Sequence, residues 1–522
     1  MSRVEHRSAP DAPTVVVEPP EAHASRARLL SALGEALGVR ILPAGGRTSA
    51  AASAAIVFGD RRPTGGLPAI VLPAEAPQFR PQSVEVGFAA DSRIDRSLRS
   101  ASLSHRAATL VALADLADGE VLAHVGRTPV WVRQGDVERV AVGIAELDES
   151  ELLRNRVSCG GFLPLVPIVD FLRRSAPDSF APPEQRAAFV FDDPNLHALS
   201  YGYLDYNRLA ADARRVGYHV AFATIPLDTW HASRAAVRLF RSHRDVLSLL
   251  VHGNDHLRHE LGRSRDSGQS RALLAQARRR IERFERRYGV PVARVMAPPH
   301  GACSEAVADA MPLFFDALCI TRPYPWLDAP PPGRVLAGWG PTEIVASGIP
   351  VIPRLRLDTP HDEIVLRAFL RHPIIVYGHH GDVRGGLDVL AEVAEAVRKV
   401  GDVRWMSLDG IVRTSYDSRV HGSRLSLRLH TRRATVPIPH GVTELAVDSR
   451  SLSHLDLIVV DGEPQGPGPV PVPGGATVDV SLERRDPSDL ADGASRRPHA
   501  WPYVRRGLVE ARDRALPLVA RT

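Results

Sequence analysis

The chain has 522 residues, 44% of them hydrophobic, so it is long enough for two to four domains with cores of their own. It carries 65 basic and 60 acidic residues, and because Lys399 is its one lysine, the basic groups are almost all arginine. The near balance of charge and the lack of a basic-aromatic motif argue against a nucleic-acid-binding protein. Three cysteines are too few for a disulfide framework.

The N-terminal part divides into three segments. Residues 1–24 are polar and rich in proline, so we expect them to be disordered. Residues 25–148 combine a helical leucine stripe with short apolar runs, which predicts a small α/β domain. Residues 149–185 predict a helical connector. The sequence shows no signal peptide and no run of about 18 apolar residues, so we expect no membrane span and a cytoplasmic protein.

From residue 186 to about 415, short apolar runs alternate with helical patterns. This alternation predicts an α/β fold with a parallel sheet, either a parallel barrel or a near relative of one. The clearest helix, 271–288, has one apolar face and an arginine-rich face that we expect to be solvated. The predicted strands are 187–192, 219–224, 246–251, 292–297, 317–321, 349–352, 373–378 and 403–408.

The C-terminal part changes to alternating apolar and polar residues. That period of two over 424–482 predicts a small β-sandwich. Residues 483–522 follow as a polar tail that is weakly helical after Trp501.

Polar, chemistry-capable residues follow four of the predicted strands. They are Asp192-Asp193, His252 to His256, Pro298 to Gly301, and His379-His380. Since active sites of parallel barrels lie at the carboxyl ends of the strands, we expect these groups to converge on one rim.

The acidic pair and two of the histidines have the composition of a metal site. Asp192 and Asp193 repel each other unless a metal or a shared proton compensates, although a helix N-cap would also favour Asp. His252 and His256 are spaced four residues apart. Carboxylate oxygens together with imidazole nitrogens suit a divalent ion, most readily Zn²⁺.

In their order and their strand positions, these motifs resemble those of NodB-type polysaccharide deacetylases, carbohydrate esterase family four. The resemblance covers about 186–415. It implies a distorted (β/α) barrel of seven to eight units, flanked here by the N-terminal α/β domain and the C-terminal β-sandwich. It also implies metal-dependent removal of acetyl groups, N-acetyl more than O-acetyl, from a carbohydrate.

The resemblance implies a role for each matching residue. Asp193, His252 and His256 would bind the metal and leave a position open for water. Asp192 would be the general base and His379 the general acid. A backbone N–H near His300 would help hold the oxyanion.

The sequence departs from the family pattern at several positions. Ala297 stands where the family has an arginine that orients the base. His300, after Pro299, replaces an aromatic residue. Trp326 or Trp339 would form the apolar wall beside the acetyl methyl group, and His380 would contact substrate or act as the acid in place of His379.

Three other functions remain open from the sequence. A glycoside hydrolase would need two acids across a cleft, about 5 to 9 Å apart. A catalytically weakened carbohydrate-binding or scaffold protein would fit the two additional domains and the loss of the arginine at Ala297. A thiol hydrolase would use Cys303, which follows Gly301 at a possible helix start. The sequence does not indicate an oligomeric state.

Overall fold

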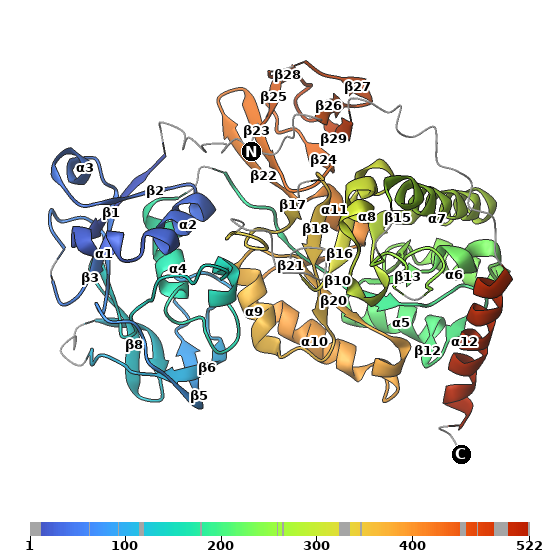
Figure 1. The fold of residues 1–522 in the computed structure, drawn as a ribbon, viewed down its shortest axis with the longest axis horizontal. Helices are drawn as coiled ribbons and strands as arrows, with labels where there is room; N and C mark the ends of the chain where they lie inside the picture. The colour runs from blue at the N-terminus through green and yellow to red at the C-terminus, as the bar shows by residue number, and fades with distance from the viewer. Residues whose placement is uncertain are drawn as a thin grey trace. The chain divides into compact units, whose positions relative to one another are not determined.

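The structure is a computed structural model, and it describes residues 12–61, 63–91, 93–113, 119–177, 180–257, 259–263, 266–322, 335–344, 347–448, 456–466, 468–484 and 500–519. The chain forms two compact units (Figure 1). Unit 1 comprises residues 1–179, 330–340 and 360–370, and unit 2 comprises residues 180–329, 341–359 and 371–522.

Unit 1 is built on a nine-stranded sheet in the order β2-β1-β3-β4-β9-β8-β7-β5-β6. The strands from β2 to β9 in this order pair in parallel, and the remainder form an antiparallel meander. The strands are β1 (Thr14–Glu18), β2 (Arg40–Pro43), β3 (Ala54–Phe58), β4 (Ala69–Leu72), β5 (Phe79–Phe88), β6 (Ser102–Ala108), β7 (Glu120–Val125), β8 (Thr128–Gln134) and β9 (Val137–Val140).

The position of β1 corrects the prediction that residues 1–24 are disordered. Val15, Val16 and Val17 are fully buried between two parallel neighbours, β2 and β3. A three-residue apolar run fits a strand buried on both faces. The prolines on either side of it favoured the prediction of disorder instead. Residues 1–11 lie outside the described residues.

Helices of unit 1 pack with this sheet around one large apolar cluster. Residues of the predicted connector 149–185 belong to that cluster through Leu165 and Phe171, so this segment is part of the unit's core. The helices are α1 (Pro20–Ala24), α2 (Ala27–Leu37), α3 (Gly46–Ala50), the 3₁₀ turn η1 (Leu153–Arg156), α4 (Val166–Ser175) and α9 (His361–Phe369).

Unit 2 contains a ten-stranded, largely parallel sheet in the order β17-β18-β16-β15-β14-β13-β10-β20-β19, with β21 also on β10. Its strands coincide closely with those predicted from the sequence. They are β10 (Gln185–Asp192), β13 (Val220–Thr224), β14 (Leu247–Val251), β15 (Val292–Met296), β16 (Ala317–Ile320), β17 (Glu343–Ile344), β18 (Pro350–Pro353), β19 (Leu355–Arg356), β20 (Ile374–Gly378) and β21 (Val403–Trp405).

The segment 350–356 joins the two ends of this ladder. Its first half, β18, pairs in parallel with β16, and its second half, β19, pairs in parallel with β20. One face of the strands shares a single buried cluster of mostly small residues, which α11 covers through Leu408 and Ile411. Strand β10 contributes Ala188 and Val190 to this inner face, so Asp192, two residues on, points the same way.

Helices and short turns connect the strands of unit 2 (Figure 1). The helix predicted over 271–288 is observed as α7, four residues longer at its start. The connecting elements are the small hairpin β11 (Ser200–Tyr201) and β12 (Leu204–Asp205), α5 (Tyr206–Val216), η2 (Pro226–Trp230), α6 (Arg234–Ser242), α7 (Ser267–Tyr288), η3 (Pro299–Gly301), α8 (Glu305–Ala310), η4 (Met311–Leu313), η5 (His380–Val383), α10 (Asp388–Lys399) and α11 (Leu408–Arg413).

Two four-stranded sheets follow, in the orders β22-β23-β25-β28 and β24-β29-β26-β27. Alternate residues of both sheets meet in one apolar cluster, as the period-two pattern requires. The strands are β22 (Tyr416–His421), β23 (Arg424–Leu429), β24 (Arg433–Pro437), β25 (Glu444–Val447), β26 (Asp456–Val460), β27 (Glu463–Pro464), β28 (Val470–Pro471) and β29 (Thr477–Arg484).

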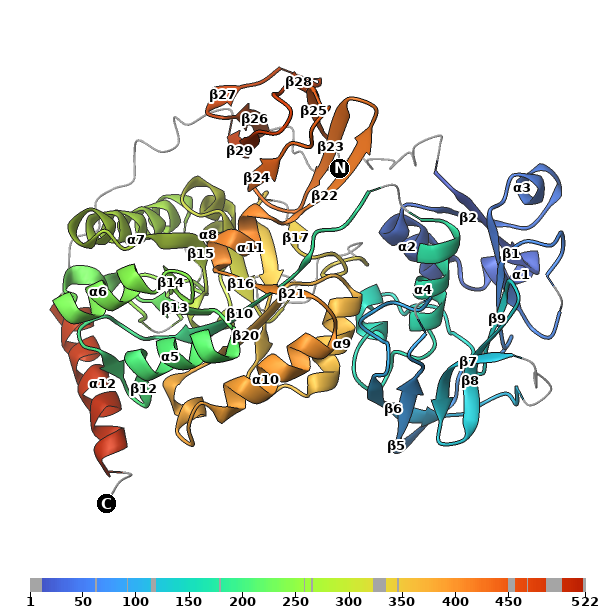
Figure 2. The same cartoon turned by 180° about the vertical axis from the view of Figure 1, so that it is seen from behind.

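The last described element is the helix α12 (Ala500–Val519), in the segment predicted to be a tail. Figures 1 and 2 show α12 along the edge of unit 2, beside β12 and α6. Of the helices in the described ranges, none has the length and apolarity needed to cross a bilayer.

Candidate metal centre and active site

The candidate site lies where neighbouring parallel strands of unit 2 end. Asp192 ends β10 and Asp193 follows it, His252 follows β14, and His379 follows β20. Strand β10 pairs with β13 and with β20, and β13 pairs with β14, so these ends are adjacent in the sheet. The ladder continues into the loops, because the amide of His252 donates to the carbonyl of Thr224 at 2.9 Å.

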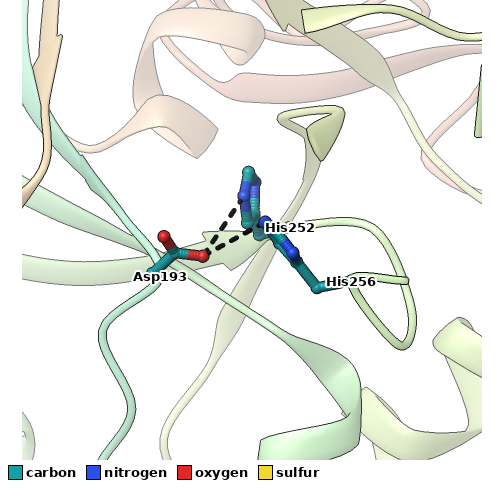
Figure 3. A group of neighbouring side chains, drawn as sticks. All are labelled: Asp193, His252 and His256. Carbon is teal, nitrogen blue, oxygen red and sulfur yellow. Dashed lines mark ion pairs between the residues drawn. The ribbon is translucent and has the colours of Figure 1, made fainter. Parts of the chain in front are cut away.

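Asp193, His252 and His256 form the group in the described residues whose ligand atoms could hold one metal ion, all within 4.8 Å of one another. Asp193 Oδ1 lies 3.7 Å from His252 Nε2 and 3.3 Å from His256 Nε2. Figure 3 shows both contacts converging on this one carboxylate oxygen. The same oxygen is buried and has no hydrogen-bond partner among the described residues. A buried acceptor without a donor is costly, so the arrangement fits a cation at this position.

The tautomer of His252 is fixed by the strand beside it. Its Nδ1 lies 2.8 Å from the carbonyl oxygen of Ala297. A carbonyl only accepts hydrogen bonds, so Nδ1 carries the proton and Nε2 presents its lone pair toward Asp193. A metal-binding histidine is oriented by this kind of contact in most proteins. Ala297 thus supports the site through its backbone.

Burial and mutual charge set the protonation of the other two groups. Burial alone would raise the pKa of Asp193, but the nearby His252 and His256 outweigh it, so the pKa is lowered to about 2. Burial, with His252 adding to it, lowers the pKa of His256 to about 4. At neutral pH the Asp193 carboxylate is therefore ionised and the His256 imidazole is neutral, the states in which they bind metal.

The loop that carries the two histidines is held from inside by Glu260. The buried carboxylate of Glu260 accepts the backbone N–H groups of Asn254 at 2.6 Å and His256 at 2.8 Å, and also that of Asp255. Burial raises the pKa of Glu260, while these amides stabilise its charge. Gly253 makes the close approach possible, because a Cβ there would lie 2.3 Å from Glu260 Oε1 and 2.6 Å from a Pro299 carbon.

Left-handed backbone concentrates around this centre. Seven non-glycine residues in the described chain have positive φ, and four of them are Asp193 (81°), His256 (53°), His259 (51°) and His300 (61°). Such conformations are unfavourable for ordinary residues and persist where the surroundings enforce them, often at functional sites. The positive φ of Asp193 shows that the backbone leaves the extended conformation directly after β10.

Asp192 has a different partner. Both of its oxygens accept hydrogen bonds from Arg354, from Nη1 and Nη2, each at 2.9 Å, and both side chains are buried. The Arg354 guanidinium also lies 3.8 Å from the centroid of the Tyr377 ring. Burial opposes ionisation of Asp192, but Arg354 together with His252 leaves its pKa lowered. An arginine therefore orients Asp192, although Ala297 occupies the position where the family carries one.

Sequence reasoning missed Arg354 because no motif marks it. It lies between β18 and β19, 162 residues from Asp192 in the chain. The available signal was an arginine flanked by the apolar residues of a predicted strand end, 349–352, in a chain with many arginines.

The two histidines after β20 occupy different environments. His379 is exposed and lines a cavity of about 590 Å³, together with Tyr377, Asp382 and Arg384. His380 is partly buried, stacks on Tyr203 with ring centroids 5.9 Å apart, and lies 3.7 Å from an oxygen of Asp513. Burial lowers the pKa of His380.

The remaining predicted substrate residues are distributed unevenly. His300 is exposed, with its ring centroid 5.4 Å from that of His256, and Pro299 is buried close to Gly253 of the ligand loop. Trp339 is buried in the core of unit 1, so the structure gives it a packing role in place of the predicted wall beside the acetyl group. Trp326 lies outside the described residues.

The structure also bears on the alternative nucleophile and the alternative acid pair. Cys303 is buried, and burial raises the pKa of its thiol, so it does not form the reactive thiolate of a thiol hydrolase. Asp192 is bound to Arg354 and Asp193 faces two histidines, so neither is the free carboxylic acid that a glycoside hydrolase needs.

No protein-family model matches the sequence, and no curated protein matches it. Solved structures do match. They include a family 4 carbohydrate esterase from Streptomyces lividans in complex with acetate, with 12% identity, a TM-score of 0.27, and coverage of 43% of this chain and 93% of that one. A family 4 acetyl xylan esterase from Clostridium thermocellum in complex with a cobalt ion has 11% identity, a TM-score of 0.26, and coverage of 43% and 88%.

A third match is a proposed polysaccharide deacetylase from Mycobacterium smegmatis, with 15% identity, a TM-score of 0.32, and coverage of 44% and 90%. Two of these matching structures, from Streptomyces lividans and Clostridium thermocellum, are described as family 4 carbohydrate esterases, the family that the sequence motifs resemble. At these identities and TM-scores the likeness does not assign an activity, which has to come from the site itself.

Proposed function

We propose that this protein is a metal-dependent hydrolase that removes acetyl groups, N-acetyl in preference to O-acetyl, from a carbohydrate. The observation that carries the proposal is the buried Asp193 Oδ1, which faces two imidazole nitrogens and has no hydrogen-bond donor in the described part of the chain. Asp193, His252 and His256 would hold the ion, and a two-nitrogen, one-oxygen set suits Zn²⁺. When bound, the ion would acidify a water molecule and polarise the acetyl carbonyl.

Two side chains would move protons. Asp192, kept ionised and oriented by Arg354, would act as the general base and take a proton on a carboxylate oxygen. An ionised carboxylate has about four acceptor positions, so the two hydrogen bonds from Arg354 leave room for this proton. His379, which is exposed and follows β20 beside the end of β10, would be the general acid that protonates the leaving nitrogen or oxygen.

The same features support a fold proposal. The return of the ladder through 350–356 and its single inner cluster support a distorted (β/α) barrel of seven strands, β10, β13, β14, β15, β16, β18 with β19, and β20. The paired sheets over 416–484 and their shared core support a β-sandwich. Of the two grounds for a weakened enzyme, the additional domains and Ala297, the second loses its force because Arg354 supplies the contact to Asp192.

Acetate release from the purified chain tests the proposal, with N-acetylated chitooligosaccharides and O-acetylated xylan as probes and with and without a chelator. We expect release that the chelator abolishes and that added Zn²⁺ restores. Asp192→Asn and His379→Ala should keep bound metal and lose on the order of a hundredfold to ten-thousandfold in rate. His380→Ala is the matched control for His379. No metal bound to the wild type, or release unaffected by chelation, would refute the metal-dependent mechanism.

A further inference from the structure

The helix α12 has its polar and apolar faces in the opposite arrangement from an ordinary packed helix. Its inner face is polar: buried Arg506 pairs with Asp228, and buried Asp513 accepts a hydrogen bond from Tyr201 at 2.8 Å. At the same time, seven of the eleven large apolar side chains that are exposed in the described chain lie on this one helix. A soluble helix normally buries its apolar stripe, so the outer face of α12 needs an explanation.

The outer residues form one continuous stripe. Trp501, Val504, Leu508 and Leu518 are 56%, 52%, 65% and 67% exposed. With Ala511 and Ala515, which are also exposed, they follow spacings of three and four residues and so share one helix face. Trp230, 61% exposed, belongs to η2, the element that Arg506 ties to α12 through Asp228. Two exposed tryptophans therefore lie on elements that pack together.

Positive charge borders the stripe. Arg512 remains 66% exposed although it pairs with Asp513. Arg505, which donates to the carbonyl oxygen of His256, and Arg514, which pairs with Glu510, are partly exposed. An apolar face with tryptophan and leucine, flanked by arginine, is typical of helices that lie in a membrane interface and favours anionic lipids. Tryptophan is favoured at that depth, and Trp501 lies in the stripe.

We propose that the outer face of α12 docks on the surface of an anionic lipid bilayer, with the helix lying in the plane of the interface. The polar inner face stays attached to unit 2 through Arg506 and Asp513, so docking requires no rearrangement of these contacts. The helix also contacts the candidate site, because Arg505 donates to the carbonyl oxygen of His256 at 2.8 Å. This contact places the site close to the docked helix, so the proposed function, on which this step rests, would act on carbohydrate attached to or lying close to the membrane.

A second copy of α12 is a poorer occupant of this face. An antiparallel helix pair along the stripe would bring Arg505 of one copy toward Arg512 of the other, and these like charges repel. A lipid surface with negative headgroups neutralises them instead.

Vesicle flotation of the full chain tests the proposal, using vesicles of equal parts phosphatidylcholine and phosphatidylglycerol and vesicles of phosphatidylcholine alone. We expect binding to the anionic vesicles, reduced about fivefold by Arg512→Gln and at least about tenfold by Leu508→Glu. Val420→Glu is the matched control, since Val420 is 53% exposed on β22, and it should bind as wild type.

Absence of wild-type binding to anionic vesicles would overturn the proposal, as would equal losses in Leu508→Glu and Val420→Glu. A solution dimer that Leu508→Glu dissociates would identify a second copy as the occupant and would equally overturn it. Flotation needs neither metal nor turnover, so a negative result leaves the deacetylase proposal untouched, and missing acetate release leaves the docking result interpretable.

Discussion

Replacing Arg354 should change both the local stability of unit 2 and the ionisation of Asp192. The pair is buried and bidentate, with two hydrogen bonds of 2.9 Å. Removing one partner of a buried ion pair leaves the other charge without compensation and costs about 3–5 kcal/mol. We therefore expect Arg354→Met to destabilise β10 by that amount at pH 8.

The direction of the pH effect follows from the pKa of Asp192. In the wild type this pKa is lowered, so the stabilisation is present above the unfolded carboxyl pKa and is lost as pH falls through the folded pKa. In Arg354→Met, burial would raise the pKa of Asp192 above its unfolded value, so protonation relieves the destabilisation as pH falls. The stability difference between the two proteins should therefore shrink from pH 8 toward pH 5.

Hydrogen exchange followed by mass spectrometry measures this stability difference at β10 itself. The peptide that covers β10 should lose protection in Arg354→Met, while β3 of unit 1 should remain unchanged as an internal reference. Arg356→Met is the matched control, because the Arg356–Asp358 pair is exposed and should not protect β10. The reasoning is refuted if both variants lose equal protection, if the loss does not depend on pH, or if Arg354→Met and Asp192→Asn combine additively.

Three further outcomes follow from the ligand loop. His252→Ala should lose about one equivalent of bound metal by elemental analysis, and Asp192→Asn should lose none; metal lost from both would contradict the separation of roles. Gly253→Ala should weaken metal binding, measured by competition with a chromophoric chelator, because its Cβ would meet Glu260 and Pro299, whereas Gly289→Ala is a control with φ of 62° and open space around it. In chelator-treated protein, the stability of β14 should fall as pH drops from about 6.5 to 4, because in this range the His256 imidazole binds a proton in the unfolded state but not when it is buried. His256→Asn should flatten that pH dependence in the same exchange experiment. An unchanged slope would show that another group titrates.

The parallel strands of unit 2 could be predicted because each is a short apolar run that ends in a polar group. Phe189 to Asp193 shows the pattern: three apolar residues fit a strand buried on both faces, and the acids mark its end. The same criterion failed at Val15 to Val17, where prolines on either side indicated disorder and the pairing that buries the strand comes from residues 40 and 54 onward. Burial by distant partners leaves no local signal.

The ligand set could be predicted because its members lie next to strand ends, whereas its support could not. Glu260 stands four residues after His256 with no motif to mark it, yet it binds three successive amides of the loop. That role depends on the left-handed turn at Gly253, a backbone conformation that the sequence permits without specifying. Likewise, nothing in the composition of 500–519 predicted that a charged helix face would turn inward.

The position of Arg354 links the proposed base to the completeness of the sheet. Arg354 stands between β18, which pairs with β16, and β19, which pairs with β20, so it is fixed only when both pairings form. Its amide donates to the carbonyl of Ile320 at the end of β16, and its guanidinium lies against Tyr377 of β20. Since Asp192 depends on Arg354 for its orientation and ionisation, the segment that joins the two ends of the ladder also prepares the base. An arginine at position 297, just after β15, would orient Asp192 from a strand already inside the ladder. Here the orientation of Asp192 depends instead on the segment that joins the two ends of the ladder.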